Sequence, residues 1–343
     1  MARTFRRRLQ VVRAVVVGAG ATGARAARQL TFLGELDDLV LVDTEDGRAE
    51  AVALSIGNPA RQGDAAAPLA AAEPGDVVIL ATPDGHAPLA RQAIDGGVHV
   101  VSVADTVDDV DQLLALDPKD VTLAVGAGFS PGLSCVLAAL ASRAFERVEE
   151  IHVAKVGLGG PACARHQRHA LAGEAPEWRD GEWRRHRGGS GRELCWFPDP
   201  LRGLDCYRAA LPETALLHAA FPDARRLTAR IGANRRARLA AYLPEMRKPH
   251  PEGAIGAIRV EVRGAQGVSL HDRVLGAVDR PAVASGAVAA MTARFALDGR
   301  LARTGQAGGL ASLVEPGPFL AALADRGVKV AAFDGNMEAA TVA

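Results

Sequence analysis

The chain has 343 residues, which is long enough for two domains, and 48% of them are apolar. Only 4% are aromatic, so its core must be built mainly from Ala, Val and Leu. Lys and Arg together number 40, as do Asp and Glu, so the formal net charge of +0 gives no global attraction to nucleic acid or to an acidic membrane surface. We therefore expect neither as a partner.

The start of the chain is basic and leads into a short apolar run, Ala14–Val17, that breaks at Gly18. A secretory signal needs a longer apolar stretch and a cleavage site. No stretch reaches transmembrane length without a charged or turn residue. The four cysteines show neither a CxxC motif nor the spacing of a disulfide framework. We expect a cytoplasmic protein with reduced thiols.

The first part of the chain alternates between two kinds of segment. Apolar runs predict buried strands at 13–17, 39–42, 76–81, 98–103 and 121–125. The segments between them predict helices at 24–33, 50–56, 88–94 and 107–116. Strands that alternate with helices are typical of a parallel sheet with crossover helices.

The pattern changes after Gly132. A long apolar helix is expected at 133–145, whereas 157–200 has weak periodicity; the other expected elements are strands at 150–156, 226–231 and 255–263 and a helix at 281–297. A last helix and strand, 319–325 and 328–333, are expected to return to the first domain. The predicted fold is α/β: a Rossmann doubly wound parallel sheet (1–132), an inserted α+β substrate and dimerisation domain (133–300) and a C-terminal return (301–343).

A glycine-rich turn follows the first predicted strand and opens the first helix. It reads GxGxxG, with glycines at 18, 20 and 23. In this context the first glycine allows a tight turn, the second lets the backbone approach a pyrophosphate, and the third allows close packing of helix and strand. The helix N-terminus then offers free N–H groups to phosphates. We expect this turn to bind a nicotinamide dinucleotide through Gly18, Gly20, Ala21, Thr22 and Gly23.

Asp43 lies 20 residues after Gly23, at the end of the second strand. A carboxylate there accepts hydrogen bonds from the ribose hydroxyls and repels a 2′-phosphate, so NAD is the expected cofactor. Arg48 is close in sequence, which leaves NADP open.

Ligands of such sheets bind outside the carboxyl ends of the strands. This position brings Thr82 and Pro83 to the cofactor. It also makes His86 and Asp105 candidate catalytic residues. A loop histidine such as His86 also fits a solvated turn.

Gly126–Ser134 reads GAGFSPGLS and resembles the GxGFxPG(L/I)(S/T) segment of the saccharopine dehydrogenase-like family. The similarity extends over Val77–Pro83, Gly97–Val103 and a tail at 314–327. The family includes saccharopine reductases, lysine 6-dehydrogenases and carboxynorspermidine dehydrogenases. The resemblance implies an NAD(P)-dependent oxidoreductase that acts on a C–N bond of an amino-acid-like or polyamine-like substrate, by amine oxidation or imine reduction.

This segment leaves a strand and opens a helix. Gly128 and Phe129 are expected near the nicotinamide, and Ser130 at the substrate, whose carboxylate the helix N-terminus can hold. A tight interdomain hinge is an alternative role for the same residues, and the two roles are compatible.

The middle of the chain gathers Arg and His residues between 163 and 192. His166 and His169 lie three residues apart on a predicted helix and so share a face. We expect His166 and Arg192 to bind an anionic substrate group and His169 to act in catalysis, because Arg forks suit carboxylates. A solvated basic surface is the alternative. A zinc site with Cys163 lacks a fourth ligand, so no metal is predicted.

Two other functions remain open. One is a sugar or polyol dehydrogenase of the Gfo/Idh/MocA type, and the other is a regulatory protein that senses dinucleotides. Gfo/Idh/MocA enzymes typically carry a Glu-Lys-Pro segment where this chain has Ala104-Asp105-Thr106. Lys119 is expected at the surface, and so is Lys155 on its strand, although Lys155 is left open as a substitute for the missing lysine. Alcohol oxidation needs a placed base, so the absence of a lysine at this position favours chemistry at a C–N bond. We expect the substrate to be a small molecule and the protein to form a homodimer.

Overall fold

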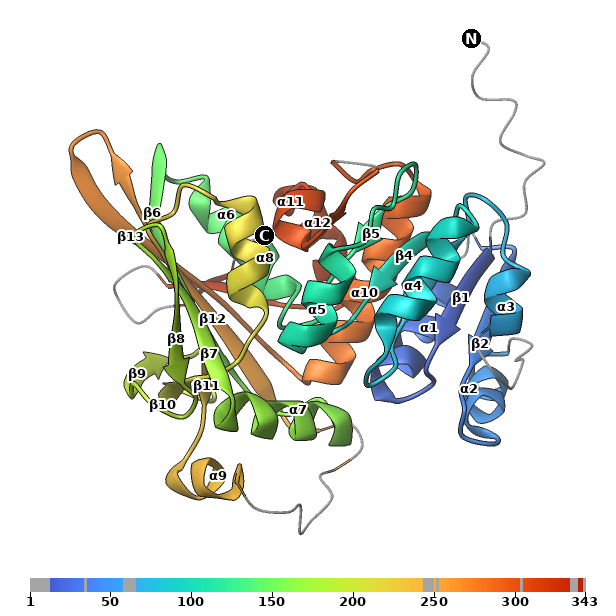
Figure 1. Ribbon diagram of the computed structural model, residues 1–343, viewed down its shortest axis with the longest axis horizontal. Helices are drawn as coiled ribbons and strands as arrows, with labels where there is room; N and C mark the ends of the chain where they lie inside the picture. Colours follow the sequence, from blue (N-terminus) through green and yellow to red (C-terminus); the bar gives the residue numbers. More distant parts are fainter. Residues whose placement is uncertain are drawn as a thin grey trace.

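A computed structural model describes residues 13–33, 36–57, 66–242, 250, 253–302, 305–333 and 339–341. The basic start of the chain, up to residue 12, lies outside these residues. Two sheets lie side by side in Figure 1, a smaller one on the right and a larger one on the left.

The smaller sheet is parallel throughout, in the order β14-β5-β4-β3-β1-β2. The chain places β2 on one side of β1 and β3 on the other, so a crevice is expected outside the carboxyl ends of β1 and β3. The predicted doubly wound sheet is confirmed. Its strands are β1 (Arg13–Val17), β2 (Asp38–Val42), β3 (Val77–Leu80), β4 (His99–Ser102), β5 (Leu123–Ala124) and β14 (Ala307–Gly308).

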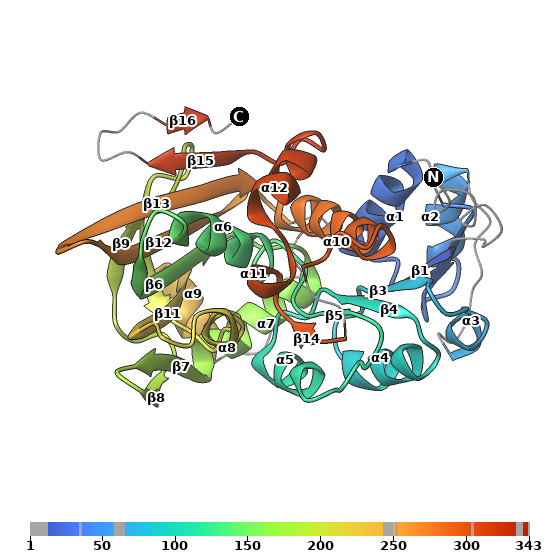
Figure 2. The ribbon, with the colours of Figure 1, turned by 90° about the horizontal axis from the view of Figure 1, so that it is seen from above.

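Helices cover both faces of this sheet, which is why strands such as β3 are apolar at every position and fully buried. In Figure 2, α1 and α10 lie on one face and α4 and α5 on the other. These helices span α1 (Ala21–Leu33), α4 (His86–Asp95), α5 (Val107–Leu114) and α10 (Pro281–Leu297); α2 (Arg48–Ile56) follows β2, and α3 (Ala66–Ala70) precedes β3.

Helix α10 corrects one predicted boundary. It was expected in the inserted domain (133–300), but it packs against α1, β3 and β4 of the smaller sheet. Gly286 is the reason for the close approach: a Cβ there would lie 2.5 Å from the Cβ of Arg25 on α1. Small residues on a helix let two backbones meet, and this signal is weak in a sequence rich in Ala and Gly.

The larger sheet follows the order β16-β15-β13-β12-β6-β11-β10-β9, with β7 pairing β11 and β8. Its pairs are antiparallel except for β6 with β11. The strands are β6 (Arg147–Val156), β7 (Glu174–Arg179), β8 (Glu182–Arg187), β9 (Glu193–Trp196), β10 (Gly203–Arg208), β11 (Arg226–Gly232), β12 (Gly256–Gln266), β13 (Ser269–Asp279), β15 (Val330–Phe333) and β16 (Ala339–Thr341).

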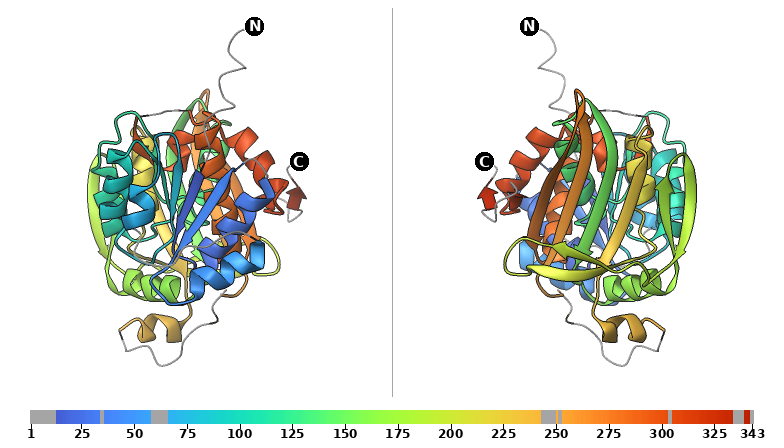
Figure 3. Two further views of the ribbon diagram at one scale, coloured as in Figure 1. Left: turned by 90° about the vertical axis from the view of Figure 1, so that its right-hand side faces the viewer. Right: turned by 90° about the vertical axis from the view of Figure 1, so that its left-hand side faces the viewer.

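Helix α6 (Leu133–Ser142) packs against β12 and β13 on the inner face of this sheet and is buried on nearly all sides. The opposite face of the sheet is turned toward the viewer in the right-hand view of Figure 3. The remaining helices are α7 (Pro161–Ala172), α8 (Glu213–Ala220), α9 (Arg235–Ala240), α11 (Leu310–Leu313) and α12 (Pro316–Ala324). None of the helices in the described part of the chain has the length and apolar character needed to cross a bilayer.

The C-terminal segment (301–343) was expected to return to the first domain; of its elements, β14 pairs with β5 of the smaller sheet and α12 packs against α10. The expected last strand, 328–333, was assigned to the first domain, but β15 pairs with β13 in the larger sheet. Beside β5, the smaller sheet is already extended by β14. The residues of a short apolar strand do not indicate which sheet edge it joins, so the sequence could not show whether 328–333 belongs to the smaller or the larger sheet.

Candidate functional site

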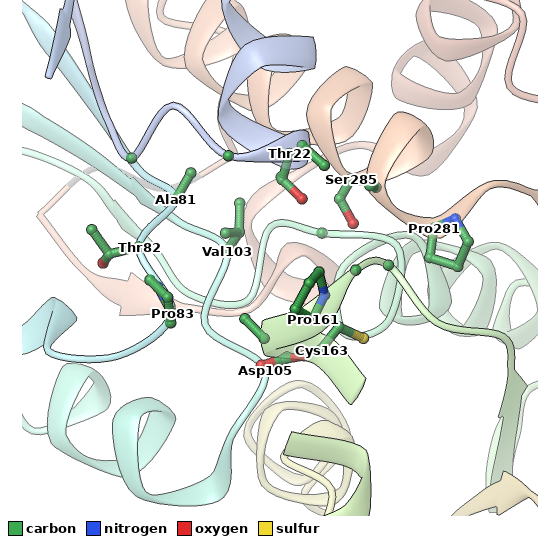
Figure 4. Close-up of a pocket in the computed structure, with 18 of the residues that line it drawn as sticks. Thr22, Ala81, Thr82, Pro83, Val103, Asp105, Pro161, Cys163, Pro281 and Ser285 are labelled. Carbon is green, nitrogen blue, oxygen red and sulfur yellow. The ribbon is translucent and has the colours of Figure 1, made fainter. Parts of the chain in front are cut away.

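A cleft of about 840 Å³ lies where the two parts of the molecule meet. It is lined by loops at the carboxyl ends of β1–β4, by β6 and by the N-terminal ends of α7 and α10. Figure 4 looks into it, with Thr22 of α1 and Thr82 on one side and Asp105 and Cys163 on the other. The cleft therefore lies outside the strand ends, where ligands of such sheets bind.

The glycine turn forms one end of the cleft, and its three glycines differ in their surroundings. A Cβ on Gly18, whose φ is +98°, would lie 2.6 Å from the carbonyl oxygen of Ala81, and one on Gly23 would lie 1.7 Å from the carbonyl oxygen of Gly18. A Cβ on Gly20 would meet no atom within 4 Å. Gly18 and Gly23 are thus required by packing, whereas Gly20 leaves open space in the cleft. Ala21 and Thr22 line the cleft at the start of α1, so the turn fits a pyrophosphate.

Asp43 holds the glycine turn in place. Its Oδ2 accepts a hydrogen bond from the N–H of Ala19 at 2.7 Å, and its Oδ1 accepts one from the N–H of Glu45 at 2.8 Å. A carboxylate has about four acceptor positions, so acceptor capacity remains for ribose hydroxyls. Arg48 lies 3.7 Å from Asp43 and pairs with Glu45. An acidic and a basic side chain therefore both lie beside the expected adenosine ribose, so these contacts do not decide between NAD and NADP.

The middle of the cleft is lined by Thr82 and Pro83 from the loop after β3, and by Gly128 and Phe129 from the turn before α6. The N–H of Phe129 donates to Oγ of Ser285 on α10 at 2.9 Å, which ties this turn to the helix. The hydroxyl of Thr82 is buried and has no hydrogen-bond partner within the described residues. A free donor beside the cleft suits a polar ligand atom.

Asp105 and His166 meet at the far end of the cleft. Asp105 follows β4, His166 lies on α7, and Nδ1 of His166 is 2.6 Å from Oδ1 of Asp105. Nε2 of His166 lies 3.2 Å from Asp84 but makes no hydrogen bond there. Arg165 also pairs with Asp84, at 3.1 Å. The Rossmann loops and α7 are therefore joined by charged contacts.

Charges in this pair stabilise one another. Burial would raise the pKa of Asp105, but the hydrogen bond from His166 and the positive charges of His166 and Lys155 lower it below its ordinary value. Burial would likewise lower the pKa of His166, but the hydrogen bond and negative charge of Asp105, with the charge of Asp84, raise it. The ionised pair is favoured.

Lys155 corrects a prediction. It was expected at the surface, but it is buried on β6, lines the cleft, and donates from Nζ to the carbonyl oxygen of Ser130 at 2.9 Å. Ser130 also lines the cleft. A signal was present in the sequence: Ile151, Val153 and Lys155 alternate along one strand, so the lysine shares the face of two core residues.

Cys163, on the first turn of α7, also lines the cleft. Burial raises the pKa of its thiol, and the negative charge of Asp105 acts in the same direction. The thiol is therefore held neutral. In the described ranges, no group of three or more His, Cys, Asp or Glu side chains is gathered as metal ligands are.

Three residues proposed from the sequence lie outside the cleft. His86 is fully buried, with Nδ1 at 2.8 Å from Oγ of Ser102 and Nε2 at 2.9 Å from the carbonyl oxygen of Thr82, so it supports the loop. His169 is exposed on α7, although His166 is buried. Arg192 is 70% exposed and pairs with Asp205. The expected anion site therefore keeps His166 without Arg192, and the expected catalytic residue His169 does not line the cleft. Near Asp105, the basic side chains that line the cleft are His166, Arg165 and Lys155.

No protein-family model matches the sequence, and a comparison with curated proteins finds no match. Solved structures do match. Apo saccharopine dehydrogenase (L-Glu forming) from Saccharomyces cerevisiae superimposes with a TM-score of 0.65 and 16% identity, over 97% of this chain and 100% of that chain. DAP dehydrogenase of C. glutamicum, in complex with DAP, gives a TM-score of 0.50 and 14% identity, over 90% and 95% of the two chains. The chain shares the fold of these dehydrogenases.

Proposed function

We propose that this protein is an NAD(P)-dependent dehydrogenase or reductase that acts on a C–N bond of an amino-acid-like or polyamine-like small molecule. One observation carries the proposal: the glycine turn and the ionised Asp105–His166 pair line the same cleft. The fold shared with saccharopine dehydrogenase supports it, as does the family resemblance of the Gly126–Ser134 segment.

The residues of the cleft fit the proposed cofactor. The turn at Gly18–Gly23 would hold the pyrophosphate, Asp43 the adenosine ribose, and Thr82 and Phe129 would lie toward the nicotinamide. A bound nicotinamide dinucleotide accepts or supplies the hydride. Every other task, which includes binding the substrate and moving its proton, falls to side chains of this chain.

Asp105 is the residue that we assign to the substrate nitrogen. Its Oδ1 accepts from His166, which leaves Oδ2 to accept from an ammonium group in the cleft. Hydride can leave the carbon only after the ammonium has lost a proton, so a base is needed. Asp105 takes that proton from the nitrogen on its free Oδ2, while His166 keeps its hydrogen bond to Oδ1. Lys155 and Arg165 are the cations that would hold a substrate carboxylate.

Lys155 favours a second candidate function, oxidation of an alcohol. Alcohol oxidation needs a placed base, and the expectation against it depended on the absence of a lysine. A buried lysine in the cleft removes that argument. The two functions differ in substrate and share the cofactor site.

The deciding experiment is turnover of NAD(H) with a panel of amino acids, polyamines, aldoses and inositols. The proposal expects NADH to form with at least one amine and with no sugar. Robust turnover of a sugar and none of any amine would replace it with the second candidate. NADH binding without any turnover would favour the dinucleotide sensor. The homodimer, the cytoplasmic location and the preference for NAD over NADP stay predictions.

A further inference from the structure

A buried carboxyl group lies directly behind the cleft. Glu213, in the first turn of α8, has no exposed surface, and Ser130 donates a hydrogen bond from its hydroxyl to Oε1 of Glu213. The other oxygen, Oε2, has no hydrogen-bond partner in the part of the chain that the structure describes. Buried carboxyl oxygens without a partner are rare in native proteins and call for an explanation.

Ser130 is the only link that these contacts give Glu213 to the cleft. It lines the cleft and is partly exposed there, whereas its carbonyl oxygen accepts from Lys155. The backbone and the hydroxyl of Ser130 are thus both held by hydrogen bonds, to Lys155 and to Glu213. A serine hydroxyl has one hydrogen and two lone pairs. Because Glu213 takes the hydrogen, the oxygen that faces a ligand can only accept.

We infer that Glu213 sets the polarity of the substrate site by fixing the hydroxyl of Ser130 as a hydrogen-bond acceptor, so that the site selects a ligand group bearing N–H donors, that is, a primary or secondary ammonium. This inference rests on the proposed function and names the chemical class that the site takes. Glu213 is a positioning residue, because it acts through Ser130.

The surroundings of Glu213 include a buried thiol and the start of a helix. Cys135 on α6 lies nearby, and its pKa is raised to about 12, by burial and then by the negative charge of Glu213, so the thiol remains neutral. The first turn of α8 favours negative charge through the helix dipole. Asp105 and Ser130 line the same cleft. A nitrogen there would find two acceptors, and a carbonyl or carboxylate oxygen would find no donor in the hydroxyl of Ser130.

A simpler role is possible for Glu213: stabilising the start of α8. The test must therefore measure something that this role leaves unchanged. We choose two probes of equal charge. n-Butylammonium has N–H donors, and n-butyltrimethylammonium has none. Binding of each to the NADH-loaded protein is measured by the change in NADH fluorescence. The variants are Ser130→Ala, which removes one atom, and Glu213→Leu, and the control is Ser134→Ala on the neighbouring α6.

We expect the wild type and the control to prefer n-butylammonium. Loss of a hydrogen bond to a charged group should weaken that probe by about 10- to 100-fold in Ser130→Ala. The loss should be smaller in Glu213→Leu, where the hydroxyl is no longer held as an acceptor but keeps its lone pairs, and n-butyltrimethylammonium should be unchanged in both. Equal weakening of both probes, or no change in either, overturns the inference, and so does a wild type that does not prefer n-butylammonium. Should Glu213→Leu fail to fold, Ser130→Ala decides alone. Turnover is not needed, so failure of the proposed function shows separately, in the substrate panel.

Discussion

Replacing Asp105 with Asn tests whether the charged pair in the cleft joins the two parts of the molecule. At the 2.6 Å between Nδ1 of His166 and Oδ1 of Asp105, and with an effective dielectric constant of about 20, the attraction is roughly 6 kcal/mol before desolvation. Removing both partners from water offsets much of it. The net contribution to stability is then that of a hydrogen bond between charged groups, about 1.5–3 kcal/mol.

The pH dependence gives this prediction its sign. The pKa of His166 is raised above its ordinary 6.5, so its contribution is fully present below pH 6.5 and is lost as the pH rises through the raised pKa. The pKa of Asp105 is lowered below 3.8, so its contribution is present above pH 3.8 and is lost as the pH falls through the lowered pKa. The ion pair between Asp105 and His166 therefore stabilises the fold most between pH 3.8 and pH 6.5.

Urea unfolding followed by circular dichroism measures the effect. Asp105→Asn should lower the free energy of unfolding by about 1.5–3 kcal/mol at pH 6, and by less at pH 9, because the contribution of His166 is lost as the pH rises through its raised pKa. The matched control is Asp120→Asn, an exposed carboxylate on the same domain. Equal losses at pH 6 and pH 9 would refute the argument, because the missing contribution would then not depend on the charge of His166.

Three further predictions concern the cofactor site and the cleft. Gly23→Ala should reduce both stability and NADH affinity, because its Cβ would overlap the carbonyl oxygen of Gly18. Gly20→Ala should fold normally, because its Cβ would meet no atom, but should bind NADH more weakly than the wild type. Thermal unfolding measures the stability of each variant, and fluorescence titration measures its NADH affinity. Asp43→Ala should weaken NADH binding by about tenfold or more and narrow the gap to NADPH, and a wild type that binds NADPH about tenfold better than NADH would contradict the NAD preference. Arg192→Ala should leave KM and NADH binding unchanged, since its side chain lies outside the cleft, and a raised KM would return it to the substrate site.

The Rossmann part was predictable because its signals are local. Arg13–Val17 is a strand with the predicted bounds, and the turn after it has the glycines that packing requires. Each of these features depends on a few neighbouring residues. Strands of a parallel sheet are buried on both faces, so they appear in the sequence as unbroken apolar runs.

The larger sheet was less predictable because its residues satisfy one another across strands. Glu177 on β7 is buried and forms ion pairs with Arg208 of β10 and Arg226 of β11. Charged residues on a buried strand look like surface residues when read singly. The segment 157–200, which showed weak periodicity, therefore contains α7 and three strands.

Some residues of the candidate site could also be predicted from local sequence signals, and others could not. Asp105 was found because it follows a clear strand, and His166 because basic residues cluster near it. His169 was chosen by helical spacing to His166, yet it points to solvent. Residues three apart on a helix differ by about 60° in direction, so one can be buried while the other lies at the exposed edge.

The ionisable groups of the cleft come from both parts of the molecule, which has a consequence for catalysis. Asp84 and Asp105 belong to loops of the smaller sheet, whereas Arg165 and His166 belong to α7 beside the larger sheet. In the proposed function, the Asp105–His166 pair at the substrate nitrogen is therefore assembled only when α7 lies against those loops.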